Sequence, residues 1–568
     1  MQNPRILRFL IENTEDETIK ELAKDKLNFK PLTQQEESMY QGIVNYKKIP
    51  GLGGFSDGII RDAETKLLDG GTYSVNNSEF LTGANISVTL TDDFMKEVEL
   101  DGEHALRFPS VETYSEEEMA VYNEKWHEIG DVREWEKQGH SVRTYRTMKA
   151  KDLWNLINIC ATYSAEPGIF FIDNANEMTN AKAYGQQVVA TNPCGEQPLA
   201  PYSVCNLAAV NLAQFAQKES KTVDFEGLKE TVRVGVRMQD NVIDATPYFL
   251  EENKVQALGE RRVGLGVMGL ADLLIYCEKE YGSDEGNVLV DQIFETIAVA
   301  AYETSADLAK ERGSFPFLQG ETLEETNRLR QAFINTGFMK KMAPHVREAI
   351  IENGIRNSHL LTVAPTGSTG TMVGVSTGLE PYFSFTYYRS GRLGKFIEVK
   401  ADIVREYLEA NPQVDANNLP EWFKASMELA PEAHADVQCI IQRWIDSSIS
   451  KTVNAPRGYT VEQVQGVYER LYRGGAKGGT VYVDGSRDAQ VLTLKAEENV
   501  MDEHHYEEKV MENRPIVLVD TIQALRSTTV TIGSEAGNKC PVCRQGTVEE
   551  MGGCNTCTSC GAQLKCGL

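Results

Sequence analysis

The nine residues Thr191–Leu199, TNPCGEQPL, place an amide, a thiol and a carboxylate at every second position. Pro193 lacks a backbone N–H and disfavours helix in the residue before it, so this stretch is expected to be extended or looped. Alternate residues of an extended chain face the same side, which would bring Asn192, Cys194 and Glu196 to one small volume. There the thiol could abstract an atom or act as a nucleophile, the carboxylate could act as a base, and the amide could orient a hydroxyl. A tight turn with a buried structural cysteine fits the local sequence equally well.

A second cysteine, Cys205, follows in YSVCNLAAVNL, at the start of an apolar run that could be a strand. Two extended segments joined by a turn could bring Cys205 to the same pocket as a redox partner. Taken alone, Cys205 is better explained as a core residue, because free cysteine is among the most buried residue types.

The segment HLLTVAPTGSTGTMVGVS reads as an apolar strand that enters a loop of Gly, Ser and Thr. Such a loop before a helix can bind phosphate through backbone N–H groups, although a plain turn is the common alternative. It is no Walker A loop, because no Gly-Lys-Ser/Thr follows. The similar-looking GLGVMG, residues 264–269, lacks a convincing preceding strand and is interpreted as close helix packing. The candidate phosphate-binding residues are Pro365, Thr366, Gly367, Ser368 and Thr369.

The length and composition favour a large cytosolic protein. The 568 residues carry 57 basic and 83 acidic side chains, and the net charge of −26 argues against nucleic-acid binding as the main task. No apolar run has the roughly 20 residues of a membrane span, and the N-terminus does not resemble a signal peptide. We therefore expect a cytoplasmic protein with no membrane partner and no direct nucleic-acid binding.

Strands alternating with helices predict parallel β/α units over residues 1–493. Within them, VRTYRTMKAKDLWNLINICATYSA is interpreted as one long helix, and the Gly- and Asp-rich residues 47–75 as an irregular loop. Residues 494–538 are dominated by charge and are expected to be an acidic linker.

Residues 539–568 form a separate cysteine-rich tail, because six of the 11 cysteines lie there. The pairs CPVC and CTSC have the spacing of a tetrahedral zinc ribbon. The two cysteines left over could be a mobile dithiol that shuttles electrons, an extra ligand, or incidental. The expected zinc ligands are Cys540, Cys543, Cys557 and Cys560, and the redox candidates are Cys554 and Cys566.

Together these motifs resemble the adenosylcobalamin-dependent (class II) ribonucleotide reductases. The matching segments run in order along nearly the whole chain, and TNPCGEQPL is highly specific. They are NPRILRFL, ANISVTLTDDFM, TNPCGEQPL with YSVCNLAAVNL, DNVID, RRVGLGVMGLADLL, LAKERGSFP, APTGSTGTMVGVSTGLEPYF, SISKTVNAP, KGGTVYVDGSR and the cysteine-rich tail.

The resemblance implies a ten-stranded α/β barrel of the ribonucleotide reductase and glycyl-radical type, with a central finger loop. It implies that Cys194 carries a thiyl radical, generated from adenosylcobalamin, and abstracts the 3′ hydrogen of a ribonucleotide. Glu196 then matches the base for the 3′-hydroxyl, Asn192 an amide that helps to hold the site, and Cys205 one member of the redox pair that reduces the 2′ position. Residues 192–196, including Pro193 and Gly195, would contact the substrate, and residues 365–369 its phosphates.

The resemblance begins at residue 3, whereas the family has a long preceding region that holds the other redox cysteine. No cysteine precedes Cys160, so the partner of Cys205 is expected on a separate N-terminal polypeptide, with a truncated gene as the alternative. The further expected partners are a thioredoxin- or glutaredoxin-like reductant and other subunits of an oligomer.

Other functions fit the sequence less well. An iron-dependent class I large subunit relays its radical through two adjacent tyrosines, but here Tyr482 is followed by Val483. A zinc-ribbon nucleic-acid-binding protein is opposed by the net charge. An inactive homologue that only binds nucleotides is opposed by the retained Asn192, Cys194 and Glu196.

Overall fold

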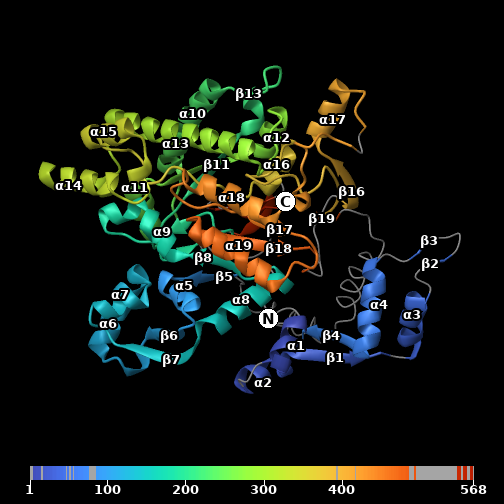
Figure 1. Ribbon diagram of the computed structural model, residues 1–568. Coiled ribbons are helices and arrows are strands. Elements are labelled where there is room, and N and C mark those ends of the chain that lie inside the picture. Colours follow the sequence, from blue (N-terminus) through green and yellow to red (C-terminus); the bar gives the residue numbers. More distant parts are fainter. Residues whose placement is uncertain are drawn as a thin grey trace. The chain divides into compact units, whose positions relative to one another are not determined.

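Figure 1 shows a computed structural model of the chain, which falls into two compact units, Met1–Leu494 and Lys495–Leu568. The structure describes residues 4–13, 17–32, 34–45, 48–49, 53–54, 57–75, 85–391, 394–415, 418–484, 486, 492–493, 547–551, 554–559 and 563–566.

A mixed four-stranded sheet forms one half of the core of the first unit, in the order β17–β18–β8–β5. Its two outer pairs, β5 with β8 and β17 with β18, are parallel, whereas β8 and β18 run antiparallel. All four residues of β8, GIFF, are buried, as expected for a strand that is covered on both faces. The bounds are β5 Ser87–Leu90, β8 Gly168–Phe171, β17 Thr452–Ala455 and β18 Gly478–Val483.

A second run of parallel strands continues from this sheet. β11 (Asn206–Asn211) pairs with β14 (Val263–Met268), and single bridges join Leu265 to Leu361 and Val363 to Ile449, just before β17. Among the described residues this series is not closed, since no pairing joins β11 to β5. The expected α/β class is therefore confirmed, whereas the described strands form open mixed sheets rather than the closed ten-stranded barrel implied by the resemblance.

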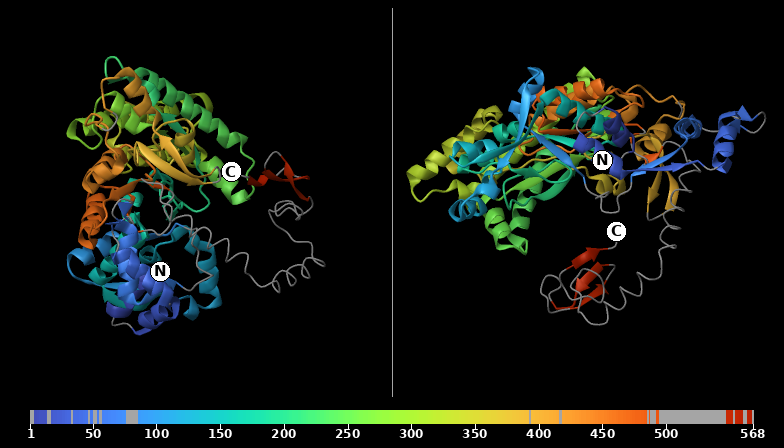
Figure 2. Two further views of the ribbon diagram at one scale, coloured as in Figure 1. Left: turned by 90° about the vertical axis from the view of Figure 1, so that its right-hand side faces the viewer. Right: turned by 90° about the horizontal axis from the view of Figure 1, so that it is seen from below.

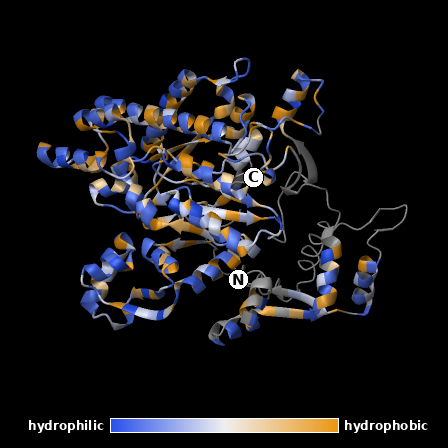
Figure 3. Cartoon of the chain, in the orientation of Figure 1, coloured by the Kyte–Doolittle hydropathy of each residue, from blue (hydrophilic) through white to orange (hydrophobic). Residues whose placement is uncertain are grey.

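Helices surround the strands (Figures 1 and 2). α8 and α19 pack against β18, α10 packs against β11 and β14, and α13 packs against α10 and α18. Figure 3 shows hydrophobic colouring on the central strands and mixed colouring on the outer helices. The helices after residue 100 are α6 Glu116–Ile129, α7 Val132–Lys137, α8 Ala150–Ser164, α9 Ile172–Met178, α10 Phe225–Ala245, α11 Glu251–Glu260, α12 Leu270–Tyr276, α13 Asp284–Arg312, α14 Leu323–Ile334, α15 Pro344–Asn353, α16 Gly367–Met372, α17 Asp402–Ala410, α18 Pro431–Gln442 and α19 Val461–Arg473.

The N-terminal hundred residues contain more regular structure than their sequence predicted. Residues 57–69 and 71–75, expected to be loop, form helix α4 and strand β4, because β4 pairs with the distant β1. Leu7 and Leu10 of α1 are buried with the half-buried Cys160 of α8 packed against them. The elements are α1 Pro4–Asn13, α2 Glu17–Lys26, β1 Leu27–Pro31, α3 Gln34–Asn45, β2 Lys48–Ile49, β3 Gly53–Gly54, α4 Asp57–Asp69, β4 Gly71–Val75 and α5 Asp92–Glu99.

Further strands form small sheets around the core. The long helix expected over residues 142–165 is wrong at its start: residues 142–149 form strand β7, which pairs with β6, and helix α8 begins at Ala150. The remaining strands of this unit are β6 Glu103–Pro109, β7 Val142–Lys149, β9 Ala190–Thr191, β10 Pro198–Leu199, β12 Ala216–Gln217, β13 Thr222–Val223, β15 Thr386–Gly391, β16 Gly394–Lys400 and β19 Leu492–Thr493.

The second unit contains an antiparallel three-stranded sheet of β20 (Val548–Met551), β21 (Cys554–Cys557) and β22 (Gln563–Cys566). In its register the backbone of Cys554 lies opposite that of Cys566, and the Cys557 side chain is buried. Three of the expected zinc ligands, Cys540, Cys543 and Cys560, lie outside the described residues, as does the acidic linker. Within the described part of the chain, no group of three or more potential ligands could hold a metal ion.

Candidate active site on the finger hairpin

The TNPCGEQPL segment forms a hairpin, here called the finger hairpin (residues 190–199). β9 and β10 pair antiparallel, and residues 192–197 form the loop between them. Pro193 keeps the loop from being helical, and Gly195 adopts a φ of +83° that favours glycine. The Gly195 N–H donates to the Asn192 carbonyl oxygen over 3.0 Å, so the chain turns at its tip.

This turn corrects the expectation that Asn192, Cys194 and Glu196 all face one side. The Cys194 side chain is exposed, whereas Glu196 is only 2% exposed. The Asn192 carboxamide oxygen accepts the Gln197 backbone N–H at 3.0 Å, so it braces the loop. A turn replaces the continuous extended chain because Gly195 allows a positive φ that extended strands do not use.

Cys194 and Glu196 nevertheless lie close enough to interact. Partial burial raises the pKa of the Cys194 thiol, and the nearby Glu196 carboxylate raises this pKa further. The Oε2 atom of Glu196 is buried and has no hydrogen-bond partner among the described residues. An unpartnered buried carboxylate oxygen is costly and calls for a missing donor, such as a ligand hydroxyl.

The finger hairpin is fixed to the strands beneath it through Glu196. Its carbonyl oxygen accepts the Ser448 N–H at 2.9 Å and the Thr362 hydroxyl at 2.8 Å. The guanidinium of the buried Arg262 donates to the Pro198 carbonyl oxygen at 3.3 Å. These bonds hold the finger loop on the series of strands shown in Figure 1.

We expect Thr362→Val to loosen this attachment while Thr362→Ser preserves it. Valine keeps the shape of the side chain but removes the hydroxyl bond to the Glu196 carbonyl, which then accepts only the Ser448 N–H; the loss of one such hydrogen bond costs about 0.5–1.5 kcal/mol. The free energy of unfolding in urea measures the loss. Equal stabilities of the valine and serine variants would show that the hydroxyl does not hold the loop.

Cys205 lies at the base of the finger hairpin, immediately before β11. A Cβ carbon on Gly264 of β14 would lie 2.7 Å from the Cys205 sulfur and 3.0 Å from the Gln197 Nε2 atom, so both groups border the same point. Burial raises the pKa of the Cys205 thiol. The arrangement confirms that a turn brings Cys205 beside the finger loop, and GLGVMG is a strand at this contact rather than a site of helix packing.

A network of buried charged groups lies behind Cys205. Arg262 pairs with Glu260 at 3.4 Å, and the Tyr302 hydroxyl donates to the Asp446 carboxylate at 2.7 Å. The Lys477 ammonium donates to the carbonyl oxygens of Asp446 and Ser447 over 2.5 Å each. Burial lowers the pKa of Lys477 to about 7. The network supports the backbone next to Ser448, which holds the finger.

Lys477 should make the protein relatively more stable at alkaline pH. Its folded-state pKa of about 7 lies below the ordinary value of 10.5, so the cost of burying its charge is full below pH 7 and is relieved as pH rises toward 10.5. The unfolding free energy of the native protein, minus that of Lys477→Met, should rise by up to about 1.4 kcal/mol per pH unit in this window. Urea titrations at several pH values measure this difference in unfolding free energy. A difference that does not change with pH would contradict the burial of the Lys477 ammonium.

The loop of residues 365–369 leads into helix α16. Thr366 has a φ of +46°, and its hydroxyl accepts the Gly378 N–H at 2.7 Å. The Gly370 N–H donates to the Thr366 carbonyl oxygen at 2.7 Å, so the first helical hydrogen bond is made only after Gly367, Ser368 and Thr369. These three residues are exposed. Their N–H groups and two hydroxyls are therefore available at the start of the helix.

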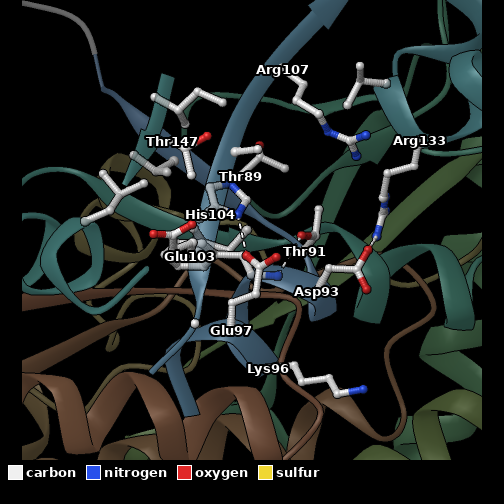
Figure 4. Close-up of a pocket in the computed structure, with 18 of the residues that line it drawn as sticks. Thr89, Thr91, Asp93, Lys96, Glu97, Glu103, His104, Arg107, Arg133 and Thr147 are labelled. Carbon is white, nitrogen blue, oxygen red and sulfur yellow. Dashed lines mark hydrogen bonds and ion pairs between the residues drawn. The ribbon is translucent and has the colours of Figure 1, made fainter. Parts of the chain in front are cut away.

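A hollow with a volume of about 830 Å³ lies elsewhere, between β5, α5 and β6 (Figure 4). None of the residues singled out from the sequence lines it. His104 pairs with Glu97 at 2.5 Å, and Arg107 with Glu136 at 2.7 Å. Arg133 reaches Asp93, Asp131 and Asp173 at 3.3, 2.8 and 2.7 Å. Both of its arginines, Arg107 and Arg133, are therefore already paired with carboxylates.

Comparison with known proteins fits the finger geometry. The family described as "Ribonucleotide reductase, barrel domain" matches residues 61–482 of this chain. The chain belongs to this family. The match includes the finger hairpin, Cys205 and the loop of residues 365–369, and it ends before the cysteine-rich tail.

Several relatives of this chain are named as vitamin B12-dependent ribonucleoside-diphosphate reductases. The protein from Mycobacterium tuberculosis is 31% identical over 430 residues, covering 72% of this chain and 52% of the relative. That from Thermoplasma acidophilum is 30% identical over 470 residues, covering 80% and 52%. A ribonucleoside-diphosphate reductase large chain from Cryptosporidium parvum is 32% identical over 335 residues, covering 56% and 39%. The chain thus spans about half the length of the B12-dependent relatives.

Some residues of the candidate site were not predicted from the sequence. Thr362, Ser448 and Arg262 hold the finger. Gln197, Arg262 and Ser448 stand in the segments TNPCGEQPL, RRVGLGVMGLADLL and SISKTVNAP that carry the resemblance, which was the available signal, but nothing local in those segments shows their role in the site. Among the described helices, none is both long and apolar enough to cross a membrane.

Proposed function

We propose that this chain carries the catalytic finger of a vitamin B12-dependent ribonucleoside-diphosphate reductase. The observation that carries the proposal is the finger hairpin itself. It combines an exposed thiol at Cys194, a buried carboxylate oxygen of Glu196 without a partner, and the Cys205 sulfur at its base. A reaction on a ribose needs these three groups close together, and the family and its B12-dependent relatives point to the same chemistry.

In this proposal Cys194, as a thiyl radical, takes the 3′ hydrogen atom from the substrate ribose. Glu196 accepts the proton of the 3′-hydroxyl, which would satisfy its unpartnered Oε2 atom. The 2′-hydroxyl leaves as water while Cys205 and a second cysteine supply two electrons and form a disulfide. Cys194 then returns the hydrogen atom to the 3′ carbon. Asn192 keeps the loop in shape through its bond to the Gln197 N–H.

The exposed Cys194 is compatible with adenosylcobalamin as the source of the radical. The thiol projects from the tip of the finger hairpin and is not enclosed by described residues, so a large group can approach it from outside. When bound, the cofactor would supply a radical by homolysis of its carbon–cobalt bond. The chain's own part is to hold the thiol beside Glu196 and to keep the finger rigid.

The loop of residues 365–369 is proposed to bind the substrate phosphates. The support is its place at the start of α16, where the N–H groups of residues 367–369 precede the first helical hydrogen bond, together with the exposure of Ser368 and Thr369. A Cβ on Gly367 would meet nothing within 4 Å, so there is open space at the loop.

The partners stay predictions. We propose that another polypeptide supplies the cysteine that pairs with Cys205, that the tail binds zinc and relays electrons through Cys554 and Cys566, and that a thioredoxin- or glutaredoxin-like protein is the final reductant. The opposed backbone positions of Cys554 and Cys566 in β21 and β22 are compatible with a dithiol.

The test is formation of deoxyribonucleoside diphosphates from each ribonucleoside diphosphate, with a dithiol reductant. The chain is assayed alone and with the polypeptide encoded beside it, each with and without adenosylcobalamin. We expect product only with adenosylcobalamin, and only when the second polypeptide is present. Product formed without the cofactor would contradict the proposed radical source, and full activity of the chain alone would contradict the separate cysteine donor.

A further inference from the structure

Gln197 is a buried side chain without an assigned task. It is 3% exposed, and neither its Oε1 nor its Nε2 atom has a hydrogen-bond partner among the described residues. Its backbone N–H donates to the Asn192 carboxamide at 3.0 Å, and its carbonyl oxygen accepts the Asn192 N–H at 3.2 Å, so its position is fixed. A buried amide that makes no hydrogen bond is costly, which requires an explanation.

The Gln197 amide and the Cys205 thiol border the same point beside Gly264. The Cβ position that Gly264 lacks lies 2.7 Å from the sulfur, 3.0 Å from Gln197 Nε2 and 2.8 Å from the Thr362 methyl carbon. Thr362 presents its methyl group here because its hydroxyl is bonded to the Glu196 carbonyl oxygen. Among the described residues, the thiol donates to the Asn206 carbonyl oxygen at 3.4 Å, and its sulfur can still accept a hydrogen bond.

The surroundings of Cys205 disfavour a negative charge on its sulfur. Burial raises the pKa of the thiol, Arg262 lowers it, and the carboxylates of Glu260, Asp446 and Glu196 raise it further. A redox cysteine must nevertheless pass through a thiolate, since the thiolate is the species that attacks or leaves in disulfide exchange. A neutral N–H donor beside the sulfur would stabilise that form.

We propose that Gln197 is a positioning residue whose Nε2 group donates a hydrogen bond to the Cys205 sulfur whenever this sulfur is a thiolate. The inference rests on the redox role of Cys205 in the proposed function. When a dithiol reductant regenerates Cys205, a thiolate of the reductant attacks the partner cysteine's sulfur and forms a new S–S bond to it. The disulfide bond to Cys205 breaks, and its electron pair leaves on the Cys205 sulfur. This thiolate later takes a proton from water. Gln197 would stabilise that leaving thiolate.

The test measures the thiolate directly and needs no substrate. Full-length reduced protein is treated with iodoacetamide from pH 7 to 10, and alkylation of the Cys205 peptide is followed by mass spectrometry. Gln197→Met has a similar volume but no donor, and we expect Cys205 alkylation about tenfold slower than in the native protein, equivalent to one pKa unit. Gln197→Glu, which replaces the donor by a carboxylate, should be slower still. An unchanged or faster rate in Gln197→Met overturns the proposal.

A matched control separates this contact from a general effect of burial. Gln438 is also buried with an unpartnered Oε1 atom, but its Nε2 group donates to the Gly478 carbonyl oxygen at 2.8 Å. Gln438→Met should leave the Cys205 rate unchanged, and an equal slowing there overturns the proposal. If Gln197→Met does not fold, Gln197→Glu is measured in its place, and a Cys205 alkylation rate equal to or above that of the native protein overturns the proposal. Because alkylation does not depend on turnover, an inactive reductase would refute the proposed function and leave this result standing.

Discussion

Cys194→Ser should abolish deoxyribonucleotide formation. A serine hydroxyl has nearly the size of the thiol but neither forms nor holds the corresponding radical, so the step that begins the proposed reaction is lost. The expected fall in the rate is at least about 10³-fold, as for removal of an essential reacting group in other enzymes. It is measured as deoxycytidine diphosphate formed from cytidine diphosphate with adenosylcobalamin present.

The fold should survive this change, since the Cys194 side chain is exposed. The unfolding midpoint of Cys194→Ser is expected to match that of the native chain, because exposed substitutions usually change stability little. Cys439→Ser serves as a second control: that thiol lies against α19, away from the finger hairpin, and its variant should retain turnover. Substantial turnover by Cys194→Ser would remove Cys194 from the reaction.

Gly264→Ala should have the largest effect on stability. The added methyl group would lie 2.7 Å from the Cys205 sulfur, 2.8 Å from the Thr362 methyl carbon and 3.0 Å from Gln197 Nε2. These atoms come from three separate segments and cannot all retreat. Overpacking of this kind costs about 1–3 kcal/mol in unfolding free energy, and it should displace the finger hairpin and lower the rate of reduction.

Gly466 provides the matched control for this variant. It lies within helix α19, and a Cβ there would meet nothing within 4 Å. Gly466→Ala should therefore stabilise the protein by about 0.4–1 kcal/mol, because alanine reduces the freedom of the unfolded chain. Urea unfolding of both variants tests the pair. If Gly264→Ala is as stable as Gly466→Ala, the close contact between β14, Cys205 and the finger is wrong.

The sequence identified the residues of the finger hairpin correctly but not the directions of their side chains. Pro193 excluded a helix, and the specific motif singled out Cys194 and Glu196. The side on which each group lies could not be read, because Gly195 turns the chain and separates an exposed thiol from a buried carboxylate. A period of two holds only in continuous strands.

The other incorrect predictions concern segments that form strands by pairing with residues far away in the sequence. VRTYRTMK reads as the start of a helix together with the residues that follow, but it forms β7 through its pairing with β6. GLGVMG has too many glycines to suggest a strand, yet Gly264 and Gly266 lie in β14 because other segments approach them closely. Thr362 and Ser448 meet Glu196 only in the folded chain, so no local pattern could identify them.

The most direct test of the central claim is whether the reaction breaks the 3′ carbon–hydrogen bond of the substrate. The assay lets cytidine diphosphate and its 3′-deuterated form compete, with adenosylcobalamin and the polypeptide encoded beside this chain, and analyses the deoxycytidine diphosphate by mass spectrometry. The account predicts that the undeuterated substrate is preferred and that no product forms with Cys194→Ser. Equal use of the two substrates, or product that does not depend on Cys194, would contradict it.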